Sequence, residues 1–106
     1  MVDSRGMVDR DVPLPKDAAL VSLMPDSLSF ATHQCLLPGT IVVLNLVMEG
    51  HALPLRVAVG WTEVVDKDRR GYLYVSHISL AGLTSTDRQL IELFIKKGRG
   101  EPQLTP

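Results

Sequence analysis

The fold of this chain is decided by residues 36–98, which read LLPGTIVVLNLVMEGHALPLRVAVGWTEVVDKDRRGYLYVSHISLAGLTSTDRQLIELFIKKG. They contain three long apolar runs, at residues 40–48, 53–65 and 72–80, each bounded by turn residues. In the first run the even positions from 42 to 48 are all apolar, and this period of two is typical of a strand with one buried face. We therefore predict a mainly β fold in which one C-terminal α-helix covers a sheet.

The predicted helix begins after Thr84 and ends before Gly98. Thr84 is a good N-cap residue, and Asp87 three positions later completes a capping box. Gly98 suits the position just past the helix, where the left-handed conformation is common. The apolar stripe expected to face the sheet consists of Leu90, Ile91, Phe94 and Ile95.

Two shorter strands are predicted ahead of these runs, over residues 18–23 and 28–32, with a turn between them. Strands at such short spacing are typical of an antiparallel meander or a small barrel. The flanking segments show neither a strand nor a helix period. The predicted organisation is a flexible N-terminal arm (1–16), a folded unit of barrel and helix (17–98) and a C-terminal tail (99–106).

Composition restricts the class of protein. The chain has 106 residues, 45% of them hydrophobic, which fits one domain with a small core. A net charge of −1 argues against binding to nucleic acid or anionic lipid, and 5% aromatic residues are few for stacking single strands. The lone Cys35 fits a reducing compartment. The first residues lack a signal-peptide pattern and the apolar runs are too short to span a bilayer, so we expect a cytoplasmic protein.

Trp61 is a candidate ligand-stacking residue. The odd positions from 53 to 59 are apolar, and strict alternation would turn Trp61 to the same face. We therefore expect Trp61 to cap the core, with ligand stacking as the alternative. Gly60, directly before it, is expected to mark a bulge or a sharp bend.

Metal and catalytic chemistry find little support. His33 and Cys35 form one closely spaced pair, and His51 and His77 lie elsewhere, whereas zinc needs about four converging ligands. The chain contains no serine elbow or glycine-rich phosphate loop. We expect no metal, no cofactor and no enzymatic activity.

The acidic pair Asp66 and Asp68 lies in a charged loop together with Lys67, Arg69 and Arg70. Because opposite charges alternate along this loop, we expect it to be a solvated turn and not an acid–base pair.

Two arginines near the start of the chain, Arg5 and Arg10, are the most suggestive polar residues. On a mobile arm, two guanidinium groups can fork onto phosphates or onto the O6/N7 edge of guanine. The alternative is a charged leader without a ligand.

From about residue 18 to residue 97 the chain resembles a PilZ domain. The likeness rests on four stretches. Two are the strand entry LPGT (37–40) and the strand LPLRVAVGW (53–61), which ends in tryptophan. The others are the strand end HISL (77–80), followed by Leu83, and the closing helix TSTDRQLIELFI (84–95). The resemblance implies a six-stranded antiparallel β-barrel with one helix across an opening. It also implies a place in bacterial signalling that governs motility, biofilm or surface polysaccharide.

PilZ domains typically bind cyclic di-GMP through two motifs, R-x-x-x-R on the arm and D/N-x-S-x-x-G on a turn. In this chain Arg5 and Arg10 are five positions apart, and Ser22, Met24 and Ser27 occupy the marked positions of the second motif. The resemblance therefore implies a degenerate member that docks a protein partner, with weak or absent nucleotide binding. The alternative is a cyclic di-GMP receptor that uses Arg5, Arg10, Ser22 and Ser27.

Overall fold

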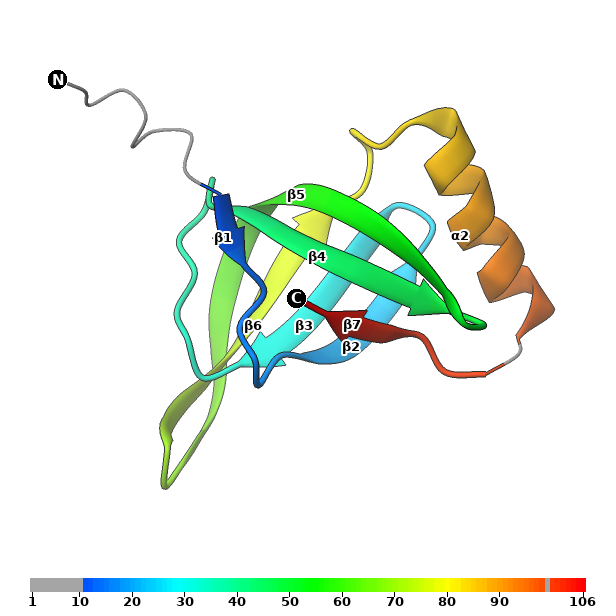
Figure 1. Ribbon diagram of the computed structural model, residues 1–106. Coiled ribbons are helices and arrows are strands. Elements are labelled where there is room, and N and C mark those ends of the chain that lie inside the picture. Colours follow the sequence, from blue (N-terminus) through cyan, green and yellow to red (C-terminus); the bar gives the residue numbers. More distant parts are fainter. Residues whose placement is uncertain (1–10, 99) are drawn as a thin grey trace, which may run out of the picture.

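The computed structural model describes residues 11–98 and 100–106, and over these residues the protein consists of a seven-stranded sheet and one helix (Figure 1). The mainly β prediction with a C-terminal helix is confirmed. In chain order the elements are β1 (Asp11–Pro13), β2 (Ala19–Met24), β3 (Ser27–Thr32), β4 (Ile41–Met48), β5 (His51–Asp68), β6 (Gly71–Ser79), α2 (Ser85–Lys97) and β7 (Gln103–Thr105).

The sheet does not close into the predicted six-stranded antiparallel barrel. Its strands run in the order β1-β4-β5-β6-β3-β2, and β7 pairs with β4 off this path. β5 pairs with β4 along the whole length of β4, so β1 and β7 share the other edge of that strand. The predictions of six strands, of closure and of purely antiparallel pairing were wrong, because β1 is parallel to β4 and β7 is a seventh strand.

β1 forms in the segment that was expected to be a flexible arm. Leu14, directly after it, is 3% exposed and belongs to the core, and its amide donates to the carbonyl of Val43 over 3.1 Å. Asp11 accepts two hydrogen bonds from the guanidinium of Arg56, at 2.7 and 2.8 Å. One buried leucine and one forked ion pair thus hold this segment against the sheet.

β7 forms in the segment that was expected to be an irregular tail. Leu104 packs against the core and pairs with Leu46 of β4. The side-chain amide of Asn45 donates to the carbonyl of Pro106 over 3.2 Å. The chain end is therefore tied to the outer edge of β4.

The core lies on one face of the curved sheet. The even positions of β4 are all buried, as their alternation predicted, and so are Leu55, Val57 and Val59 of β5. β4 and β5 are joined by a two-residue turn in which Glu49 and Gly50 have φ values of 50° and 81°. Two successive positive φ values match the hairpin turn whose twist suits the flanking strands.

The helix α2 lies at one end of the sheet, where it contacts β2 (Figure 1). Both predicted caps are confirmed: the Thr84 hydroxyl accepts from the amide of Asp87, and left-handed Gly98 donates to the Phe94 carbonyl. Ile91 and Phe94 are buried and Ile95 packs partly against the core. The prediction for Leu90 was wrong, since it is 46% exposed.

Candidate functional site

The outer face of β3, β5 and β6 carries a cluster of polar and aromatic side chains around Trp61. Ser29 lies opposite His77 across β3–β6, and His77 lies opposite Trp61 across β5–β6. Residues directly opposite each other point to the same face of a sheet. We call the cluster the tryptophan face; it consists of Ser27, Ser29, Trp61 and His77.

A β-bulge explains why Trp61 faces outward. The register of β5 against β6 shifts between Val59 and Trp61, which leaves Gly60 as the extra residue. One extra residue inverts the alternation of the side chains that follow, up to a second irregularity between Val64 and Asp66. Val59 therefore points into the core and Trp61 does not. The bulge expected at Gly60 is confirmed, whereas the expectation that Trp61 caps the core was wrong, since Trp61 is 54% exposed.

Trp61 and His77 form an aromatic stack. Their ring centroids are 3.9 Å apart and their planes differ by 11°. Backbone packing keeps the bulge narrow, because a Cβ added at Gly60 would lie 3.2 Å from the carbonyl oxygen of His77. The indole is therefore held parallel to the imidazole while much of its surface remains accessible.

Hydrogen bonds fix the imidazole of His77 on both sides. Its Nε2 lies 2.6 Å from Oε2 of Glu63, and its Nδ1 lies 3.0 Å from Oγ of Ser29. Because an ionised carboxylate can only accept, Nε2 carries a proton, and in a neutral ring Nδ1 then accepts from the serine hydroxyl. Ser29 is 6% exposed and its strand is paired on both sides. The hydroxyl of Ser29 is therefore suited to orienting His77 and not to nucleophilic attack on a ligand.

A hollow of about 390 Å³ lies beside this stack. It is lined by Asp26, Ser27, Ser29, Gly60, Trp61, His77, Ile78 and Ser79. Its walls offer three serine hydroxyls, a carboxylate and an aromatic face, which can hold a flat heterocycle by stacking and hydrogen bonding.

The structure does not bring all the predicted ligand residues together. Arg5 and Arg10 lie outside the described residues. Ser27 lines the hollow beside Trp61, but Ser22 lines a different one of about 400 Å³, between β2 and the segment that follows α2. Sequence reasoning missed Ser29 and the orienting role of His77, although both occupy outward positions of predicted strands.

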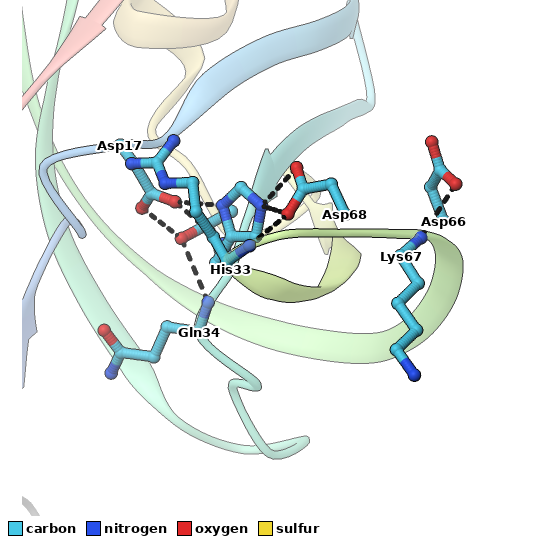
Figure 2. Close-up of polar contacts among 8 residues, drawn as sticks. Asp17, His33, Gln34, Asp66, Lys67 and Asp68 are labelled. Atoms are coloured by element: carbon cyan, nitrogen blue, oxygen red, sulfur yellow. Dashed lines mark hydrogen bonds and ion pairs between the residues drawn. The ribbon is translucent and has the colours of Figure 1, made fainter.

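A second histidine, His33, lies between two carboxylates (Figure 2). Its Nδ1 is 2.9 Å from Oδ2 of Asp17, and its Nε2 is 3.0 Å from Oδ2 of Asp68. Asp17 precedes β2, His33 follows β3, and Asp68 ends β5, so the contact joins three separate segments. We call Asp17, His33 and Asp68 the histidine clasp.

The charges of the clasp stabilise one another. Hydrogen bonds from Thr32 and from the backbone and ring of His33 lower the pKa of Asp17 to about 2. Hydrogen bonds to Asp17 and then to Asp68 raise the pKa of His33, and the bond from His33 lowers the pKa of Asp68. Asp66 and Asp68 lie at the end of strand β5, so the expectation that both belong to a solvated turn was wrong. Asp68 contacts His33, whereas Asp66 bonds only the adjacent amide of Lys67 among the interactions described.

Apolar side chains are exposed on α2. Leu90 is 46% and Leu93 is 53% exposed, and both border a hollow of about 370 Å³ between α2 and the β4–β5 turn. The hollow is also lined by Met48, Leu53 and Phe94. We call this hollow with its two leucines the helix groove.

Comparison with known proteins adds no relative: no family model, no curated protein and no solved structure matches the chain. Among residues 11–98 and 100–106, no three histidine, cysteine or acidic side chains are grouped to hold a metal ion. Over the same residues, no helix has the length and apolar character needed to cross a membrane.

Proposed function

We propose that this chain is a PilZ-like regulatory module of bacterial cyclic di-GMP signalling that acts in the cytoplasm by docking a protein partner. The PilZ resemblance spans residues 18–97, which correspond to β2 through α2. Within that span the strands β4-β5-β6-β3-β2 are all paired antiparallel and are followed by the capped helix. The unexpected strands β1 and β7 lie outside it.

The helix groove is the observation that carries the docking role. Leu90 and Leu93 are three positions apart, so they project from neighbouring positions on one helix face. Fully burying a leucine contributes about 1.5–3 kcal/mol, so covering these two half-exposed side chains would contribute about 2 kcal/mol together. The exposed side chains of Lys97 and Glu49 also line the hollow. The partner that fits is an amphipathic segment with two apolar anchors and polar flanks.

Site-specific photo-crosslinking tests this role. A benzophenone amino acid placed at Leu93 in living cells should give one discrete adduct, and Leu90→Ser in the same chain should abolish it. The matched control carries the same label at Leu37, which is 68% exposed and distant from α2 in sequence. Equal adducts from both positions, or none from Leu93, would refute docking at the groove.

A second candidate is direct cyclic di-GMP reception, which the exposed indole of Trp61 favours. Its accessible surface could stack one guanine while Ser27 binds a polar group of the ligand. Because Trp61 is the only tryptophan of the chain, its fluorescence reports stacking directly. Receptor function requires quenching that saturates, is lost in Ser27→Ala, whose side chain lines the hollow beside Trp61, and survives in Ser22→Ala, whose side chain lines another hollow.

A further inference from the structure

The histidine clasp connects the tip of the β5–β6 hairpin to the body of the sheet. Asp68 is the last residue of β5, and only two turn residues separate it from β6. Over residues 11–98 and 100–106 the tip is therefore held by its own strand pairing and by the bond from His33 (Figure 2). Loss of that bond would leave strand pairing alone to position the turn.

The geometry of the clasp requires a charged imidazole. Both ring nitrogens of His33 face carboxylate oxygens, which only accept when ionised. A neutral imidazole has a single N–H, so it can donate to Asp17 or to Asp68 but not to both. The second nitrogen would then direct its lone pair at a negative charge.

The surrounding contacts decide which carboxylate is released. Asp17 is also held by the hydroxyl of Thr32 at 2.5 Å and by the backbone amide of His33 at 2.8 Å. Among the residues that the structure describes, Asp68 has one other hydrogen-bond donor, the amide of Arg70 in the adjacent turn, at 2.8 Å. The neutral ring therefore keeps its proton on Nδ1, facing Asp17, and no longer donates a hydrogen bond from Nε2 to Asp68.

We propose that the histidine clasp is a proton-operated latch, which fixes the tip of the β5–β6 hairpin while His33 is charged and releases it when His33 becomes neutral. Asp68 is half exposed, so its release needs no unpacking of the core. The hairpin tip that is freed carries three cations, Lys67 at the end of β5 and Arg69 and Arg70 in the turn. The latch therefore makes the position of this charged tip depend on pH.

The direction of the switch follows from the charges that act on His33. Asp17 and Asp68 raise the pKa of His33 above its ordinary 6.5, while burial and the charge of Arg70 oppose them. The latch is therefore closed at pH values below 6.5 and opens as the pH rises through the raised pKa. Asp17 and Asp68 stay ionised throughout this range, because the pKa of each is lowered.

Nitrogen NMR of the uniformly ¹⁵N-labelled chain tests the latch between about pH 5 and about pH 9. Long-range ¹H–¹⁵N correlations should show both nitrogens of His33 protonated at the acidic end and Nε2 deprotonated with a midpoint above 6.5. The backbone heteronuclear NOE of Lys67, Arg69 and Arg70, which reports picosecond-to-nanosecond motion, should fall at the same midpoint. A midpoint at or below 6.5, or an NOE that does not change with it, would overturn the proposal.

Two matched variants separate the latch from general effects of charge. Asp68→Ala removes both the charge and every hydrogen-bonding atom that faces Nε2, so it should lower the midpoint of His33 and give the low NOE at every pH. Asp66→Ala removes a carboxylate from the same hairpin tip without touching His33, so both readouts should remain as in the unmodified chain. An Asp68→Ala protein that keeps the original midpoint and NOE profile would refute the latch.

Discussion

Leu14→Ala should destabilise the protein strongly, even though Leu14 lies in a segment whose sequence reads as a flexible arm. The side chain is 3% exposed and belongs to the hydrophobic core. Truncating a buried leucine costs about 2–5 kcal/mol, the lost transfer free energy plus a cavity term. A domain of this size has about 5–15 kcal/mol of total stability, so the loss is a large part of it. With a urea m-value of about 2 kcal/mol/M, the unfolding midpoint should fall by about 1–2.5 M.

Urea unfolding followed by far-UV circular dichroism measures this effect. Leu37→Ala is the matched control, because Leu37 is 68% exposed and its truncation should change stability by less than about 0.5 kcal/mol. A Leu14→Ala midpoint that coincides with the control would show that the segment after β1 contributes nothing to the core. The burial of Leu14 in the core would then be refuted as a stabilising feature.

Three further perturbations test local features. Thr84→Ala removes the cap on the amide of Asp87 and should cost about 1 kcal/mol, or roughly 4–8 °C in the melting temperature; an unchanged melting temperature would contradict the cap. Gly50→Ala places a Cβ at a φ of 81° and should cost about 1–2 kcal/mol in calorimetric unfolding, and a neutral result would contradict the turn geometry. Asp17 has a pKa lowered to about 2, chiefly by Thr32, so its stabilising effect is present above pH 3.8 and lost as the pH falls toward 2. Asp17→Asn should therefore flatten the decline of the urea midpoint over that acid range, and an unaltered decline would contradict the contact.

Regular patterns of the sequence predicted the long elements. Alternation over residues 40–48 identified the buried face of β4, and the capping residues located both ends of α2. These signals are local and repeat several times within one element. β1 and β7 have three residues each, too few for a period to be recognised, and each depends on the distant edge of β4.

The candidate sites depend on contacts that a one-dimensional pattern does not contain. Strict alternation placed Trp61 inside, and one bulged residue, Gly60, placed it outside. The histidine clasp joins Asp17, His33 and Asp68, which are 16 and 35 positions apart. Only the folded sheet brings these three side chains together. Sequence spacing alone therefore indicated neither His-centred cluster.

Titration calorimetry of the full chain with cyclic di-GMP tests the central claim most directly. If this chain docks a protein partner and its own nucleotide site is eroded, the titration should give no saturable heat at ligand concentrations up to about 1 mM. A dissociation constant in the micromolar range would be obvious at that concentration. A saturating isotherm with a micromolar dissociation constant that disappears in Trp61→Ala would contradict this account and establish the chain as a receptor.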